Sequence, residues 1–284
     1  MYYFKRIYII VVLLSIVINF TIKDQFYWSS FIFYTFPLPI IILLIIGLLV
    51  FIKKHTKKII VLALILTVIW ISRSYKHNET NINESHIEIV LWNASRDRNF
   101  EDAFNEIESI PDILILVECG EKDIKKVKSK YGDNYFFLSK EEIGIFSKTP
   151  ITVKNKINSE NNSTIINFKV RGFNFYAIDL SGSMFNFRKK ELDFLFSNID
   201  KSKKMLILGD FNTPFESVHF KDFKDNFNHV FSEKGNGFRE TWPWNIPLLS
   251  LDHIWASKDL EILTVEKINT FKSDHSILKA VIKN

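Results

Sequence analysis

Hydrophobic and polar positions divide the chain into an apolar first quarter and a mixed remainder. Residues 7–22 carry no charge, and residues 25–52 form a longer uncharged run. A helix that crosses a bilayer needs about 20 mostly apolar residues, so we expect both runs to be transmembrane helices. A third apolar run, residues 59–71, is shorter and predicts a third span only if the polar residues at its ends snorkel to the membrane surfaces. The alternative for the third run is an interfacial or buried helix.

Charged residues beside these runs predict their orientation. Lys5 and Arg6 precede the first run, and four lysines lie in residues 53–58, between the second and the third. The positive-inside rule keeps both clusters in the cytoplasm. Three spans then place the rest of the chain outside the cell, and two spans place it inside. We expect a multi-pass protein of the cell membrane with an extracytoplasmic domain. The single cysteine, Cys119, does not decide the side, since a domain without a disulfide is acceptable in either compartment.

The first run is expected to stay in the protein as an anchor, because Thr21, Ile22 and Lys23 follow Phe20 where a signal peptide would end in small residues. The net charge of +5 also belongs to this region. Residues 1–72 hold 7 of the 37 Lys and Arg and 1 of the 32 Asp and Glu, which leaves 30 basic and 31 acidic residues beyond them. The basic balance is therefore no evidence for a nucleic-acid-binding surface.

We expect residues 1–72 to be the membrane anchor, residues 73–85 a polar linker and residues 86–284 a folded domain. Residues 86–93 and 111–118 have the pattern of strands entering a core, and the apolar positions from Phe100 to Ile107 between them have helical spacing. This unit predicts a βαβ crossover or its antiparallel equivalent. A second amphipathic helix is expected at residues 192–199, and further strands at residues 134–138, 143–147, 151–157, 164–170, 173–180, 205–208, 251–256, 260–267 and 277–282. Many strands with few helices predict an α/β (α+β) fold, in which two packed mixed sheets are flanked by helices in a four-layer sandwich.

Two short motifs at strand boundaries carry candidate chemistry. The first, Gly209-Asp210-Phe211-Asn212, places an acid and an amide on alternate positions of extended chain. The second, Ser273-Asp274-His275, combines a hard oxygen ligand with a titratable imidazole. Each motif alone is ordinary, since the first is also a common turn and the second a common surface pair. Together, about 60 residues apart and each at a strand boundary, they favour a catalytic site.

Several other chemistries lack their residues. The sequence has no His-Glu-x-x-His, no paired cysteines, no Gly-x-Ser-x-Gly and no glycine-rich loop followed by lysine. The zinc protease, nucleophile-elbow hydrolase and nucleotide kinase classes are excluded on this ground. The tryptophans at 242 and 244 favour core or rim positions, with a substrate-facing role as the alternative.

The order of the motifs resembles the endonuclease/exonuclease/phosphatase (DNase I-like) superfamily over residues 86–282. A strand ending in Asn, a strand ending in Glu, a Gly-hydrophobe-Ser-Lys-x-Pro-Ile stretch, Gly-Asp-Phe-Asn, an Asp-aromatic strand start and Ser-Asp-His follow one another in the expected order. They correspond here to Asn93, Glu118, residues 144–151, residues 209–212, residues 251–254 and residues 273–275. Residues 237–252 are similar to a branch of bacterial membrane-attached members.

The resemblance implies a metal site for Mg²⁺ or Mn²⁺. Glu118 would bind the ion through carboxylate oxygen, Asn93 would fix the orientation of Glu118, and Asp274 would support the metal or the nucleophile. Hard cations that keep most of their water need only one or two carboxylates, which fits this set.

The resemblance also implies the catalytic residues of a phosphoester hydrolase. Asp210 would be the general base for water, Asn212 would contact phosphate, and His275, oriented by Asp252, would stabilise negative charge on the phosphoryl oxygens. The alternative for Asp252 and His275 is a buried hydrogen-bonded pair without a catalytic role. Asp179 departs from the family, because it ends the strand where many members have a His. A carboxylate beside a phosphate is repulsive unless it is protonated or bound to metal.

Three classes of function follow. The first is a membrane-anchored, metal-dependent hydrolase of a phosphorylated substrate, which would be a nucleic acid, a phospholipid or a small phosphoester. The second, prompted by Asp179, is a catalytically degenerate binding module with the same fold. The third, a transporter or channel, is disfavoured because the apolar runs carry almost no internal ionisable residues. The sequence implies the lipid bilayer as a partner and no protein partner.

Overall fold

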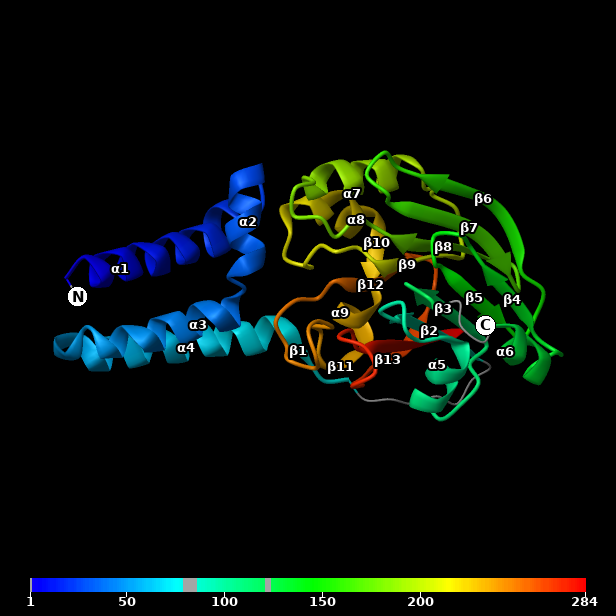
Figure 1. Cartoon of the computed structure of the whole chain (residues 1–284), viewed down its shortest axis with the longest axis horizontal. Coiled ribbons are helices and arrows are strands. Elements are labelled where there is room, and N and C mark those ends of the chain that lie inside the picture. Colours follow the sequence, from blue (N-terminus) through cyan, green and yellow to red (C-terminus); the bar gives the residue numbers. More distant parts are fainter. Residues whose placement is uncertain (1, 79–85, 121–123) are drawn as a thin grey trace.

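The computed structural model describes residues 2–78, 86–120 and 124–284. An apolar helical bundle joins a larger α/β domain, and the two lie end to end along the longest axis of the molecule (Figure 1). The bundle contains α1 (Tyr2–Val17) with its π-helical end (Ile18–Ile22), α2 (Tyr27–Thr35), α3 (Leu38–Gly47) with short 3-10 turns at Leu48–Val50 and Lys53–His55, and α4 (Thr56–Ser74).

Within the described residues, two helical segments are long and apolar enough to cross a membrane, Tyr2–Ile22 and Lys53–Ser74. The second contains the run at residues 59–71, which was expected to be short for a span. It reaches 22 residues because the lysines before the run and Ser72 and Arg73 after it are also helical. A third span is possible only if the bent pair Tyr27–Thr35 and Leu38–Val50 counts as one.

Residues 25–52, expected to form a transmembrane helix, contain two helices joined by a sharp bend. Helix α2 ends at Thr35, α3 begins at Leu38, and the two axes differ by 70°. Pro37 has no N–H to continue the ladder, and it also disfavours helical backbone at the preceding residue, Phe36, whose φ and ψ are −118° and 67°. Helix α2 therefore turns away from α3 and lies between the bundle and the domain (Figure 1).

The domain contains two mixed sheets, as the sequence predicted. Among the described residues, one sheet has the strand order β1-β11-β13-β14-β2-β3-β5-β4 and the other β10-β12-β9-β8-β7-β6. The first consists of β1 (Tyr75–Lys76), β2 (His86–Asn93), β3 (Ile113–Val117), β4 (Tyr135–Leu138), β5 (Gly144–Ser147), β11 (Gly235–Phe238), β13 (Ile262–Ile268) and β14 (Ile277–Lys283). The second consists of β6 (Thr152–Asn158), β7 (Thr164–Val170), β8 (Phe173–Asp179), β9 (Met205–Asp210), β10 (Phe227–His229) and β12 (Asp252–Ser257).

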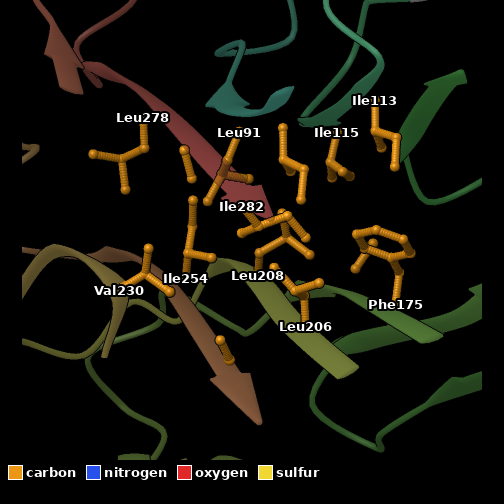
Figure 2. Packing of buried hydrophobic residues seen from close by; sticks show 14 of the residues in the cluster. Leu91, Ile113, Ile115, Phe175, Leu206, Leu208, Val230, Ile254, Leu278 and Ile282 are labelled. Atoms are coloured by element: carbon orange, nitrogen blue, oxygen red, sulfur yellow. The ribbon is translucent and has the colours of Figure 1, made fainter. Parts of the chain in front are cut away.

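The two sheets pack face to face through alternate aliphatic positions of their central strands. Leu91, Ile115 and Leu278 of one sheet face Leu208 and Ile254 of the other (Figure 2). Each of these side chains is almost completely buried, and a buried aliphatic side chain contributes about 1.5–3 kcal/mol. The strand pattern read from the sequence is thus the pattern of this core.

Helices α5 (Phe100–Glu106) and α6 (Ile124–Lys130) cover the outer face of the first sheet. Helices α7 (Arg188–Ser197) and α8 (Lys221–Asn226), with a 3-10 turn at Val218–Phe220, cover that of the second and complete the four layers. Helix α9 (Val230–Lys234) adds Val230 and Phe231 to the core between the sheets. Strands β2 and β3 are parallel with α5 between them in the chain, so the first strand–helix–strand unit is the βαβ alternative. Strands β8 and β9 are also parallel, with α7 between them. Both units bring strand C-terminal ends to one edge, where the candidate site lies.

Buried polar contacts fix the domain on the helices. Asp24, which follows α1, is fully buried, and its carboxylate accepts hydrogen bonds from the Ser217 hydroxyl and from the Val218 N–H at 3.0 Å. At the other junction, the Arg239 N–H donates to the Ser74 carbonyl at 3.0 Å. The described part of the predicted linker, residues 73–78, continues α4 into β1, and the rest of it, residues 79–85, lies outside the described residues.

Candidate active site

Three carboxylates lie side by side on neighbouring strands of the second sheet. Asp179 ends β8 and pairs in register with Asp210 at the end of β9, which pairs with Asp252 at the start of β12. Gly209 makes this packing possible, because a Cβ atom there would lie 1.8 Å from the Ile178 carbonyl oxygen, and its φ is 153°. Gly209 is therefore required for the close approach of two strands.

His275 joins this row from the other sheet. Its Nδ1 lies 2.8 Å from Asp252 Oδ2, and both side chains are almost completely buried. Burial works to lower the pKa of His275, but the charge and hydrogen bond of Asp252, with further help from Asp210, raise it to about 10. The ring is consequently a cation at neutral pH and can stabilise an anion beside it.

Asp210 is the most constrained of the carboxylates. Its two oxygens accept hydrogen bonds from the Asn93 side-chain amide at 2.9 Å and from the Asn212 N–H at 2.8 Å. Burial, followed by the charge of Asp252, raises the pKa of Asp210 to about 6. A carboxylate with such a pKa is ionised at neutral pH and basic enough to take a proton from water.

The side chains of the two asparagines expected at the site form hydrogen bonds with Asp210 and with the backbone. Asn93 was expected to orient Glu118, but the amide hydrogen bond reaches Asp210, and the Asn93 side-chain oxygen accepts from the Ser95 N–H at 3.1 Å. The side-chain amide of Asn212 donates a hydrogen bond to the Leu180 carbonyl at 2.8 Å. A side-chain amide has two N–H donors, and this hydrogen bond uses one of them.

A polar cavity of about 310 Å³ lies in front of Asp210 and His275. Its wall also contains Glu118, which directly follows β3, and Asp179. Burial, and then the negative charges of Asp210 and Glu118, hold the pKa of Asp179 well above its usual range. Asp179 thus lines the same cavity as Asp210 and His275.

Asp274 lies apart from these carboxylates. Its two oxygens accept hydrogen bonds from the Ser95 hydroxyl at 2.6 Å and from the Trp242 indole N–H at 2.8 Å. Ser273 accompanies it, with its hydroxyl donating to the Asn93 carbonyl at 2.8 Å. Ser273 and Asp274 therefore connect the segment before β14 to the end of β2 and to Trp242, and of the three motif residues only His275 lines the cavity.

The residues present fit a hard divalent cation. Glu118, Asp179 and Asp210 place three carboxyl groups around one cavity, with the Arg96 guanidinium 3.5 Å from Glu118 as a counter-charge. Oxygen ligands with open space for water are what Mg²⁺ and Mn²⁺ require. Asp210, Asp252 and His275 also have ligand atoms within 4.8 Å of one another. That group is a poorer site, because Asp252 and His275 are hydrogen-bonded to each other and a protonated ring cannot bind metal.

Two arginines of the site were missed in the sequence. Arg96 lines the polar cavity and bridges Glu118 and Glu142, and only its position three residues after Asn93 could have indicated it. Arg188 is buried, and its guanidinium donates to four backbone carbonyls, those of Asn212 and of residues 181–183. It holds the Asn212 turn against the loop after β8. An arginine in the first turn of an amphipathic helix gives no sequence signal for this role.

Comparisons with known proteins agree with this fold. The protein-family model described as "Endonuclease/Exonuclease/phosphatase family" matches residues 90–275 of the sequence. A solved endonuclease/exonuclease/phosphatase family protein from Bacteroides thetaiotaomicron is 15% identical, with 71% of this chain and 98% of that chain covered and a TM-score of 0.54. A structure of D. rerio TDP2 complexed with single strand DNA product is 14% identical, with 71% and 100% covered and a TM-score of 0.51. No curated protein matches the chain.

Identities this low establish the shared fold and nothing about the substrate. The family match covers well over half of the chain and begins and ends on elements that carry the site, β2 and His275. The chain belongs to the endonuclease/exonuclease/phosphatase family.

Proposed function

We propose that the protein is a metal-dependent phosphoester hydrolase anchored in the cell membrane, with its catalytic domain outside the cell. The observation that carries the proposal is the pairing, on one wall of the polar cavity, of a basic carboxylate, Asp210, with the Asp252–His275 ion pair. Glu118 and Asp179, in the wall of the same cavity, supply carboxylate oxygens for a metal ion. A base, a cation for the developing charge and a metal site are the parts that phosphoester hydrolysis needs.

Each residue has a task in this reaction. Asp210, held by Asn93 and by the backbone of Asn212, takes the proton of the attacking water. The His275 cation, held by Asp252, stabilises the charge that develops on the phosphoryl oxygens. Glu118 and Asp179 would hold Mg²⁺ or Mn²⁺, which supplies Lewis-acid polarisation of the phosphoryl group when bound. Asp179 would then be a metal ligand at the position of the usual His, and the bound cation would offset the repulsion between its carboxylate and the phosphate.

The arrangement of the apolar helices supports the orientation. The N-terminus and the turn between α3 and α4 lie at the end of the bundle away from the domain (Figure 1). Lys5, Arg6 and the lysines of residues 53–58 are therefore at the far end. Since basic clusters stay in the cytoplasm, the domain at the opposite end is extracytoplasmic.

The experiment is turnover of bis-p-nitrophenyl phosphate by the full chain in detergent, with Mg²⁺, with Mn²⁺ and with excess EDTA. We expect turnover with metal and none in EDTA. Asp210→Asn and His275→Ala should each lower kcat/KM by about 10²- to 10⁴-fold, the range for a lost general base or charge-stabilising donor. Undiminished rates in EDTA or in either variant would refute the proposal. If the native chain and Asp179→His are both inert with every metal, the binding module is the correct alternative.

A further inference from the structure

A second cavity adjoins the polar one and differs from it in character. It measures about 500 Å³, a volume typical of pockets for drug-sized ligands, and its wall is mostly apolar. The two cavities share Gly182, Asn212 and His275. A molecule with its phosphate at the polar site can therefore extend an apolar portion past His275 without leaving the protein.

The wall of the apolar cavity comes from both parts of the chain. Met184, Leu248 and Leu251 belong to the domain, whereas Pro37 and Ile40 belong to the start of α3, with Thr35 at the end of α2 beside them. Helix α2 lies at the junction of bundle and domain (Figure 1), which is the level of the membrane surface under the proposed topology. The cavity thus lies where an apolar region of the bilayer meets the catalytic domain.

Contacts between α2 and the domain make this cavity a fixed feature. The Tyr34 hydroxyl donates to buried Asp24 at 2.8 Å, and Asp24 is held by Ser217 and Val218 of the domain. The Arg188 guanidinium lies over the Tyr34 ring, 5.9 Å from its centroid. Arg188 also anchors the loop at residues 181–183, so one residue connects the helix, the apolar cavity and the active-site turn.

We propose that the substrate is a membrane glycerophospholipid whose phosphate enters the polar cavity while its glycerol and upper acyl portion occupy the apolar cavity. This rests on the proposed hydrolase function and adds the substrate class. A polar cavity that is joined to an apolar one selects amphiphilic molecules. The acyl chains pass Ile40 along α3 into the bilayer, because α3 leads from the cavity into the apolar bundle.

The same geometry assigns the bond that breaks. Asp210 lines only the polar cavity, so the attacking water lies on that side of the phosphorus. In-line displacement puts the leaving oxygen opposite, toward the apolar cavity. The water oxygen forms a new bond to phosphorus, the bond from phosphorus to the glycerol oxygen breaks, Asp210 takes the water proton, and the leaving oxygen takes a proton from solvent. Asp210 then releases its proton, and the products are diacylglycerol and the phosphorylated headgroup.

The test uses the full chain reconstituted with Mg²⁺ in vesicles of phosphatidylcholine and phosphatidylglycerol. We expect diacylglycerol to accumulate, and glycerophosphocholine and single-stranded DNA to be turned over at least about tenfold more slowly, because they lack the apolar portion. Leu248→Gln should lower lipid turnover by about tenfold and leave bis-p-nitrophenyl phosphate turnover unchanged. Ile246→Gln, on the same loop but outside the cavity and exposed, is the matched control and should change neither.

The outcomes separate this inference from the hydrolase function. Turnover of bis-p-nitrophenyl phosphate without diacylglycerol formation, or faster turnover of DNA than of lipid, overturns the lipid substrate and leaves the hydrolase intact. Phosphatidic acid as the product overturns the assigned bond and with it the placement of the lipid. Absence of turnover with every substrate overturns both. Equal loss of lipid turnover in Leu248→Gln and Ile246→Gln overturns the role of the apolar cavity.

Discussion

The charge of His275 gives the sharpest test of the site. Asp252→Asn keeps the shape of the side chain but removes the charge that lies 2.8 Å from the ring. A pKa of about 10, against 6.5 for an ordinary histidine, corresponds to about 5 kcal/mol of preference for the charged ring. Because the His275 side chain is only 8% exposed, solvent screens little of this energy. Without Asp252, burial dominates, and we expect the His275 pKa to fall to its ordinary value or below.

The pH profile of kcat/KM should show this change on both sides. His275 must be protonated, so activity is present below its pKa and lost as the pH rises through about 10. Asp210 must be ionised, so activity is present above its pKa and lost as the pH falls through about 6. Since the charge of Asp252 raises both pKa values, Asp252→Asn should move both limbs to lower pH. At pH 8, we expect kcat/KM to fall by about 10²- to 10³-fold.

The assay is bis-p-nitrophenyl phosphate turnover from pH 5 to 10.5 at saturating Mg²⁺, with the histidine Cε1–H resonances followed by NMR over the same range. Asp193→Asn, which removes an exposed carboxylate on α7, is the control and should leave the profile unchanged. An alkaline limb that stays near pH 10 in Asp252→Asn, with His275 still protonated at pH 8, would show that Asp252 is not the source of the His275 charge.

Three further predictions concern the metal site and the topology. Glu118→Gln should raise the Mg²⁺ concentration needed for half-maximal activity by at least about tenfold, while the unfolding temperature stays close to that of the native chain. An unchanged Mg²⁺ titration would contradict the role of Glu118 as a ligand. Asp179→Ala should also shift the Mg²⁺ titration to higher concentration, and a loss of rate without such a shift would assign Asp179 to proton transfer. Protease added to intact cells or spheroplasts should degrade the domain, and protection until lysis would place it in the cytoplasm.

Local pattern alone determined much of this protein. The short apolar runs around Leu91, Ile115 and Leu208 predicted the strands, because a sheet covered on both faces buries the side chains of both faces. Long uncharged runs predicted the apolar helices, since a bilayer accepts little else. The order of Asn93, Glu118, Asp210 and His275 along the chain indicated the family, because each motif depends only on neighbouring residues.

Tertiary structure decided which of these residues meet. Asn93 binds Asp210 and not Glu118, and Asp274 binds Ser95 and Trp242, because strand register across and between the two sheets fixes these partners, and no local pattern encodes that register. The same holds for the row of Asp179, Asp210 and Asp252 on neighbouring strands. Burial, and then the charge of neighbouring carboxylates, raises the pKa of Asp179 and Asp210, and both causes depend on residues far apart in the sequence.

The bend at Pro37 shows both contributions at once. The proline was visible in the sequence as a helix breaker, but the direction in which α2 turns depends on Asp24, whose buried carboxylate accepts hydrogen bonds from Tyr34 of α2 and from Ser217 and Val218 of the domain. That docking brings Tyr34 against Arg188 and closes the apolar cavity beside His275. A buried carboxylate must find hydrogen-bond donors, and the donors it finds are set by the packing of the whole chain.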